Sequence, residues 1–212
     1  GSDRLLELDQ DSEALETLDD QVEDAHQRAQ KLAAQLSEMR SRAGETLSSA
    51  VTQELAALAM PTASLHVRVI TEDVLHAHGA DQVQLLLAAH QGADPVALGK
   101  GASGGELSRV MLALEVVIAG SDPVPTFVFD EVDAGVGGAS ALEIGRRLDA
   151  LSHTSQVIVV THLAQVAAFA NNHLRVVKDT LGEVTTSSVA VLEGEERVSE
   201  LARMLGGMED SQ

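Results

Sequence analysis

The sequence predicts an α/β domain that carries a long N-terminal coiled-coil helix. Apolar residues recur at alternating spacings of three and four over most of the first 58 residues, which is typical of a coiled coil. After Pro61, two short apolar runs, residues 126–130 and 156–161, flank a helical pattern. Strand, helix and strand in this order, with both strands apolar on both faces, favour a buried parallel sheet with a crossover helix.

Residues 3–60 are expected to form a coiled-coil arm. Its seam consists of two series with a seven-residue period: Leu8, Leu15, Val22, Ala29, Leu36, Ala43 and Ala50, and then Leu18, Ala25, Leu32 and Met39. An amphipathic bundle helix would have a wider stripe that drifts around the helix, so the coiled coil is favoured. Near Ala43 the stripe moves to another face, which predicts docking on a domain before Met60-Pro61 ends the helix. Residues 1–2, Gly1-Ser2, are interpreted as a cloning scar.

Residues 61–212 are expected to form the α/β part. Alternation of apolar and polar residues predicts antiparallel strands, and a 3.6-residue apolar period predicts helices. The expected elements are strands near 65–69 and 83–87, a helix from 106 to 119, the strand of 126–130, a helix around 139–151, the strand of 156–161, weaker strands at 174–178 and 184–192, and a helix at 195–205.

The composition excludes several classes of function. With 14 basic and 33 acidic residues, the net charge is −19, which argues against a surface built to grip a phosphate backbone. The chain has three Phe and neither Trp nor Tyr, so a base-stacking platform is not expected. It has no cysteine, which excludes disulfides and Cys-ligated zinc and suits a reducing interior. A cytoplasmic protein without a membrane span or signal peptide is therefore expected.

Two adjacent carboxylates, Asp130 and Glu131, follow the strand predicted at 126–130. They are placed at the carboxyl edge of the sheet, where open α/β sheets bind ligands. Two neighbouring acids at a buried strand end repel each other and lose hydration, so a compensating group is expected. A hard cation held by one acid, with the other acting as a base toward water, would supply it. A simple exit from the strand with solvated acids explains the pair equally well.

The stretch Ser103-Gly104-Gly105-Glu106 opens a predicted helix. Its glycines would expose backbone N–H groups to an anion, with the helix dipole behind them. Alternatively, Ser103 is an ordinary helix cap.

A histidine, His162, follows the second apolar strand and is expected at the same sheet edge as Asp130 and Glu131. A lone histidine is usually structural, but this placement favours a functional role. The phosphate-cradling pattern G-x-x-x-x-G-K-[ST] is absent. At Gly99-Lys100, the nearest match, a glycine follows where the pattern requires Ser or Thr, and Asp94 occupies the position of the first glycine. The chain thus has anion-capping and water-activating groups without the loop that holds a triphosphate.

A hydrolase is an alternative interpretation of the same residues. Residues 101–105 also fit G-x-S-x-G, and Ser103, Asp130 and His162 follow the chain order of an α/β-hydrolase triad. The nucleophile elbow requires an apolar strand that runs directly into it, and residues 96–100 are too short and glycine-rich. This alternative is therefore the weaker one.

Taken together, the motifs resemble those of ABC-type ATPases. The stretch Ser103-Gly104-Gly105-Glu106 resembles the signature motif, residues 127–131 the Walker B strand with its catalytic glutamate, residues 132–135 the D-loop, and Thr161-His162 the switch histidine. The coiled coil narrows the resemblance to SMC-like proteins. Three longer stretches are similar to the RecN family of DNA double-strand-break repair proteins: residues 102–109, 160–168 and 197–207.

This resemblance implies the carboxyl-terminal lobe of an ABC/SMC-type P-loop ATPase head, with ATP and Mg²⁺ as its ligands. Asp130 would help to hold Mg²⁺, Glu131 would polarise the attacking water, and His162 would contact the γ-phosphate. The stretch Ser103-Gly104-Gly105-Glu106 would cap the ATP held by an opposite head. Asp133 would communicate across the dimer.

The resemblance also implies partners. The N-terminal half of the same head would supply the Walker A loop, a second head would complete a homodimer around ATP, and an antiparallel helix would pair with the arm. ATP binding would join the heads and hydrolysis would part them, in an assembly that acts on DNA in repair and recombination; the chain alone would be inactive. The alternative is a non-catalytic coiled-coil scaffold. Glu131 argues against it, since a catalytically dead head does not need a second carboxylate beside Asp130.

Overall fold

The structure is a computed structural model that describes residues 2–119, 124–179 and 186–206. The elements in these ranges are α1 (Ser2–Ala57), β1 (Ser64–His76), β2 (Gly79–Ala88), β3 (Val96–Ala97), α2 (Gly104–Ile118), β4 (Thr126–Phe129), α3 (Gly138–Ser152), β5 (Gln156–Val159), α4 (Ala164–Ala167), β6 (His173–Asp179), β7 (Thr186–Leu192) and α5 (Gly194–Leu205). The strands form the sheets β1-β2-β3, β4-β5 and β6-β7. The chain forms two compact units, the first of residues 1–47 and 66–86 and the second of residues 48–65 and 87–212.

Much of the predicted seam of helix α1 is exposed to solvent. Five seam side chains are between 55% and 67% exposed: Leu15, Leu18, Val22, Leu32 and Met39. The side chain of Leu8 lies outside the described part. Beyond the change of stripe, Val51, Leu55 and Leu58 are fully buried in the second unit, as the shifted pattern predicts. Although α1 has 56 residues, no helix in the described ranges is long and apolar enough to cross a membrane.

The end of α1 lies at Ala57, before the predicted stop at Met60-Pro61. Ala59 has a left-handed φ of 61°, and the Met60 N–H donates to the Leu55 carbonyl over 3.0 Å. This is the closure of a Schellman motif, in which a left-handed residue ends the helix before any proline is needed. Both Leu55 and Met60 are buried, as the apolar contact that accompanies this motif requires.

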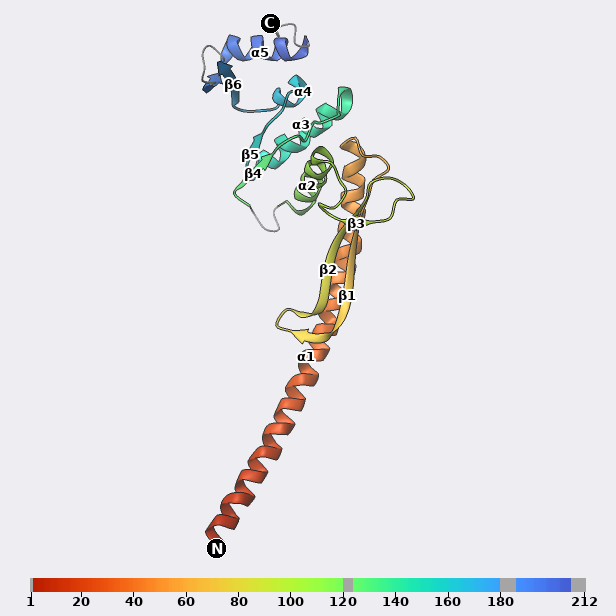
Figure 1. Cartoon of the computed structure of the whole chain (residues 1–212), viewed down its shortest axis with the longest axis vertical. Helices are drawn as coiled ribbons and strands as arrows, with labels where there is room; N and C mark the ends of the chain where they lie inside the picture. The colour runs from red at the N-terminus through yellow and green to blue at the C-terminus, as the bar shows by residue number, and fades with distance from the viewer. Residues whose placement is uncertain (1, 120–123, 180–185, 207–212) are drawn as a thin grey trace. The chain divides into compact units, whose positions relative to one another are not determined.

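The hairpin of β1 and β2 runs alongside α1 (Figure 1) and is longer than the two strands predicted for it. A buried carboxylate, Asp81, fixes it to the helix: its oxygens accept hydrogen bonds from Ser37 at 2.8 Å and Arg40 at 3.1 Å of α1. Close approach is possible because Gly44 has no side chain, since a Cβ there would lie 2.9 Å from Val67 Cγ1 of β1. The hairpin therefore packs closely against the part of α1 that carries Ser37, Arg40 and Gly44, and it also approaches Leu36 of the seam, whose side chain lies near Gly79 of β2.

Strands β4 and β5 form the predicted parallel pair, and α3 is the crossover between them. Phe129 is buried, but Val128 and Ile158, which are opposite each other in the register, are 66% and 45% exposed. The expectation of burial on both faces is therefore wrong for this chain, because its described elements leave one face of the two-stranded sheet uncovered.

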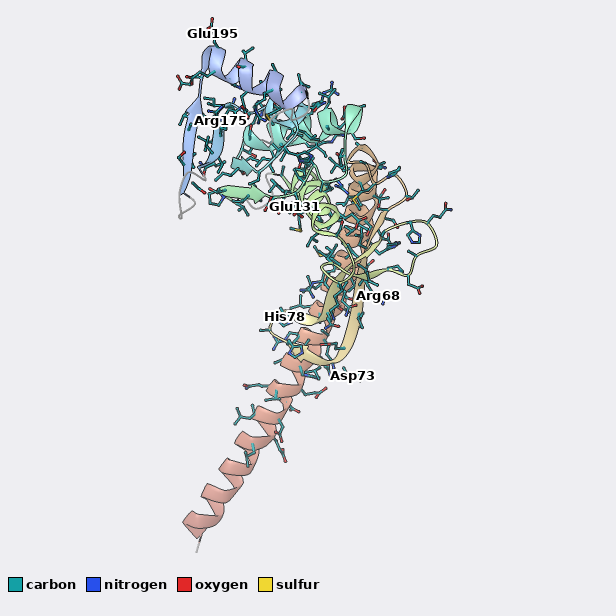
Figure 2. All side chains as sticks on the ribbon, turned by 45° about the horizontal axis from the view of Figure 1, so that its top comes forward. Arg68, Asp73, His78, Glu131, Arg175 and Glu195 are labelled. Atoms are coloured by element: carbon teal, nitrogen blue, oxygen red, sulfur yellow. The ribbon has the colours of Figure 1, made fainter. Side chains whose placement is uncertain are left out.

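The last elements are an antiparallel hairpin, β6 and β7, and helix α5. Residues 184–185 of the strand predicted at 184–192 lie outside the described ranges. Glu200 of α5 is buried and pairs with two arginines. Its carboxylate lies 2.7 Å from Arg203 Nη2 and 3.5 Å from Arg175 Nη1. Arg175 projects from β6 (Figure 2), so this cluster joins the hairpin to α5. Helix α4, four residues long, was not predicted.

The hydrogen bonds that Asp81 accepts from Ser37 and Arg40, here called the Asp81 clamp, predict that acid weakens the attachment of the hairpin to α1. Burial alone would raise the pKa of Asp81, but hydrogen bonds from Ser37, Arg40 and Thr71 outweigh it and keep the pKa below its ordinary value of 3.8. The ionised carboxylate therefore stabilises the hairpin above pH 3.8, and this contribution is lost as pH falls through the lower folded-state value. We expect Asp81→Ala to speed hydrogen exchange of the β1 and β2 amides about tenfold at neutral pH.

The matched control for this prediction is Glu38→Ala, which removes an exposed carboxylate that pairs with Arg42 on the same helix. Exposed ion pairs contribute little, so its exchange rates should equal those of the wild type. Equal rates in the Asp81→Ala variant and the wild type would contradict the clamp.

Candidate functional site

The register of β4 and β5 brings the ends of the two strands to one edge. Phe129 lies opposite Val159, and the next N–H along β5, that of Val160, donates to the Phe129 carbonyl over 2.9 Å. Because the strands are parallel and end level with each other, Asp130 and His162 follow at the same edge of the sheet.

Asp133 links the segment that follows β4 to the segment that follows β5. Its carboxylate, 2% exposed, accepts hydrogen bonds from the Thr161 hydroxyl and, over 3.2 Å, from the His162 backbone N–H. The same oxygen lies 3.3 Å from Nδ1 of the His162 ring, whose side chain is largely exposed. Thr161 in turn accepts the Leu163 N–H at 3.1 Å. In this chain Asp133 therefore points inward and positions His162, while its expected role across a dimer stays a prediction.

Ser103 caps helix α2, as one of the two sequence interpretations predicted. Its Oγ accepts the Glu106 N–H over 3.3 Å, and the Ser103 N–H and hydroxyl donate to Glu106 Oε2 at 2.9 and 3.0 Å. This is a capping box, which satisfies backbone donors at the start of a helix without a ligand. These bonds from Ser103 hold the pKa of Glu106 below its ordinary value against the opposing effect of burial.

The glycines of this turn lie against the loop that carries the acids. A Cβ on Gly104 would lie 2.5 Å from Glu131 Oε2. A Cβ on Gly105 would lie 2.8 Å from Ala134 Cβ and 2.9 Å from the Glu131 carbonyl oxygen. Close packing between the start of α2 and residues 131–134 therefore requires glycine at position 105, whereas at position 104 only the flexible end of the Glu131 side chain would have to move.

Asp130 and Glu131 are both exposed (Figure 2 labels Glu131). The expectation that they lose hydration is therefore wrong for this chain, since water can screen their repulsion. Glu131 has a φ of +57°, which is unfavourable for a residue with a long side chain, and its carbonyl accepts the Ala134 N–H over 3.0 Å. Strained backbone of this kind occurs preferentially at functional sites.

Ser108 and Arg109 of α2, for which the sequence predicted no individual role, hold this loop in place. The Ser108 hydroxyl donates to the Asp130 carbonyl at 2.6 Å. Nη1 of Arg109 donates to the Ala134 carbonyl at 3.0 Å and lies 3.5 Å from the Val132 carbonyl. A signal for Arg109 was present in the sequence, because its spacing from Gly105 and Leu112 places a charged residue on the buried stripe of the helix.

The contacts of these side chains argue against the hydrolase alternative. The Ser103 hydroxyl donates to Glu106, and the His162 ring pairs with Asp133. A Ser103–Asp130–His162 triad would need the histidine between the serine and Asp130. In addition, β3, the strand that precedes Ser103, has only two residues and does not run into it.

Asp130 could serve as one ligand of a metal ion that takes its other ligands from water and substrate. Within residues 2–119, 124–179 and 186–206, no group of three or more His, Asp or Glu side chains is placed to hold a metal. Magnesium usually keeps several waters and binds one or two carboxylates together with substrate phosphates. An exposed carboxylate such as that of Asp130, at a sheet edge, suits this mode of binding.

The contact of Gly105 with the loop predicts a steric penalty. We expect Gly105→Ala to lower the free energy of unfolding by about 1–3 kcal/mol, because backbone and Ala134 must move to admit the new Cβ. Gly137→Ala is the control, since a Cβ there meets nothing within 4 Å and its φ of −162° suits any residue. Urea denaturation of both variants measures the difference, and equal midpoints would refute the close packing.

Comparison with known proteins identifies related sequences over most of the chain. The family model described as RecF/RecN/SMC N terminal domain (SMC_N) matches residues 98–185. The DNA repair protein RecN of Streptomyces coelicolor is 58% identical over 193 residues, which cover 85% of this chain and 34% of that protein. RecN of Mycobacterium tuberculosis H37Rv is 45% identical over 228 residues, covering 98% of this chain and 38% of that protein. The chain thus spans little more than a third of the length of these curated relatives.

A solved structure shows the same fold. The Smc head domain of Pyrococcus yayanosii, solved with a coiled coil and joint, matches 77% of this chain and 30% of its own chain, with a TM-score of 0.54 and 23% identity. This likeness confirms the predicted fold class, an α/β SMC-type head with a long helix. On the sequence relatives and this fold, the chain belongs to the RecN family.

Proposed function

We propose that this chain forms the carboxyl-terminal lobe of an ATPase head, with part of its coiled-coil arm, in a RecN-like protein that acts in DNA double-strand-break repair and recombination. The observation that carries the proposal is the common edge of β4 and β5, where Asp130, Glu131 and His162 gather. Under this proposal, ATP binding between two heads joins them and hydrolysis separates them. The domain limits are those of the sequence, with the arm at 3–60 and the head lobe at 61–212.

Each residue at the edge has a proposed task that suits its surroundings. Asp130 would hold Mg²⁺ with water and phosphate oxygens, and the ion would neutralise charge on the phosphates. Glu131, exposed on a turn where its φ is +57°, would accept a proton from the attacking water. His162 would donate to the γ-phosphate, because Asp133 fixes its ring through Nδ1 and leaves most of the side chain accessible.

The start of α2 would cap the ATP of the opposite head. Ser103 and Gly104 are exposed, and the helix dipole behind them favours an anion. The Ser103 hydroxyl donates to Glu106 in this structure, so its proton would turn from that carboxylate to a phosphate oxygen when ATP binds. Phosphoryl transfer needs positioned donors and charge neutralisation more than covalent participation, and this arrangement supplies both.

Exposed apolar surfaces support the proposed protein partners. The seam of α1 would pair with an antiparallel helix, and the uncovered face of β4 and β5 would pack on the N-terminal half of the head, which would contribute the phosphate loop. An open cavity of about 250 Å³ between α2 and β4 belongs to the same surface and is lined by Leu107, Ser108, Met111, Glu115, Phe127, Val128 and Phe129.

The net charge of −19 suggests that DNA contacts lie elsewhere in the assembly, and the lack of cysteine suits the cytoplasm.

This proposal predicts that hydrolysis depends on Glu131 only in the complete protein. The isolated chain should turn over no ATP, whereas the full-length protein, or this chain mixed with the missing lobe, should do so. Glu131→Gln should lower kcat by about a hundredfold or more and leave ATP binding intact, because it removes the base without changing the size of the side chain. Phosphate release and equilibrium binding of a fluorescent ATP analogue would measure the two effects.

Glu195→Gln, an exposed substitution on α5 (labelled in Figure 2), serves as the control and should match the wild type. Rapid hydrolysis by the isolated chain would overturn the two-lobe proposal. If Glu131→Gln cells repaired broken DNA as well as the wild type, the scaffold alternative would be favoured.

A further inference from the structure

The guanidinium of Arg109 is a buried charge inside the second unit. The residue is 7% exposed, and its paired nitrogen, Nη1, donates only to backbone carbonyls of the loop after β4. Its Nε is buried and has no hydrogen-bond partner among the described residues. Within the described ranges Arg109 forms no ion pair with a carboxylate, although Glu106 on the same helix acts on its charge from a distance.

Such a residue is costly for folding alone. Burial disfavours the charged form and lowers the pKa of Arg109, and a buried donor without an acceptor loses its hydration without compensation. Apolar side chains of similar volume often replace buried charges at no cost in stability. The presence of arginine here is therefore better explained by what its donors hold in place than by packing.

The carbonyls that Arg109 contacts belong to Val132 and Ala134, on either side of Asp133. Asp133 positions His162, and the neighbouring Glu131 has a strained backbone and an exposed side chain. Exposed side chains have little packing of their own to fix them. The backbone of residues 131–134 therefore sets the position of Glu131 directly and that of His162 through Asp133. Arg109 of α2 donates hydrogen bonds to this backbone.

We propose that Arg109 is a positioning residue, which clamps the 131–134 backbone so that Glu131 and His162 are held in their places at the sheet edge. The inference rests on the proposed ATPase function. It adds that the helix whose start would cap one nucleotide also fixes the hydrolytic groups of its own head. A guanidinium suits this task because the two N–H groups of Nη1 can address the Val132 and Ala134 carbonyls at once.

The first test uses this chain without nucleotide. Arg109→Met removes the donors and keeps an apolar side chain of similar length. The amides of Ala134 and Val136, which donate to the carbonyls of Glu131 and Asp133, report on the loop. We expect them to exchange about tenfold faster in the variant, while amides in α3 are unchanged. Unchanged exchange at Ala134 and Val136 would overturn the proposal.

The second test uses the complete protein and separates chemistry from binding. Arg109→Met should lower kcat for ATP hydrolysis by about 10- to 100-fold, because small displacements of catalytic groups have effects of this size, with little change in KM. Faster loop exchange with an unchanged kcat would also overturn the proposal. If the wild-type complete protein hydrolysed no ATP, the proposed function would fail while the exchange result on the loop still stood, so the two failures are distinguishable.

Two further variants sharpen the result. Arg109→Lys keeps a charge and one donating group, so its exchange rates and kcat should lie between those of Arg109→Met and the wild type. A lysine variant no better than Arg109→Met would show that donation to the carbonyls does not hold the loop, and it also serves as the test if Arg109→Met fails to fold. Arg146→Met, which removes an exposed arginine of α3 that pairs with Glu143, is the control and should change neither readout.

Discussion

The level, parallel pairing of β4 with β5 is the constraint on which the site depends. Parallel strands joined by a crossover helix end at the same edge, so the residues that follow them emerge together although about 30 positions separate them in the chain. Asp133 consolidates this arrangement, because its buried carboxylate on the first exit accepts hydrogen bonds from Thr161 and His162 on the second. A slip of one residue in the register would turn every side chain of β5 to the opposite face and break these contacts.

Both small sheets of the second unit present apolar pairs to solvent. On β6 and β7, Leu174 lies opposite Val191 and Val176 opposite Val189, and all four are more than half exposed. Together with the uncovered face of β4 and β5, they form more apolar surface than scattered single residues would. Since the chain spans only about a third of its relatives' length, these faces are consistent with the proposal that further segments of a longer protein cover them.

The elements with a long apolar period, such as α1 and α3, could be predicted from the sequence because that period reflects local geometry. Helix α4 could not, since four residues carry no period. The Schellman closure that ends α1 could not either, because Ala59 takes a left-handed position that usually belongs to glycine. In the site, the predicted strand ends were enough to expect Asp130, Glu131 and His162 at one edge of the sheet, and the register of β4 and β5 agrees with this. The contacts of Asp133 and Arg109 depend on partners 23 to 29 residues away, which only the tertiary structure identifies.

The requirements of folding explain the identity of some motif residues but not of others. Ser103 completes a capping box, and Gly105 admits the loop after β4, so both identities follow from local packing before any ligand is considered. Glu131 is different: its backbone is strained, and its exposed side chain gains little from burial. Backbone strain at a residue whose side chain gains little from packing indicates selection for the chemistry of that side chain. Among these motif residues, Glu131 therefore gives the strongest physical support for a chemical role at this sheet edge.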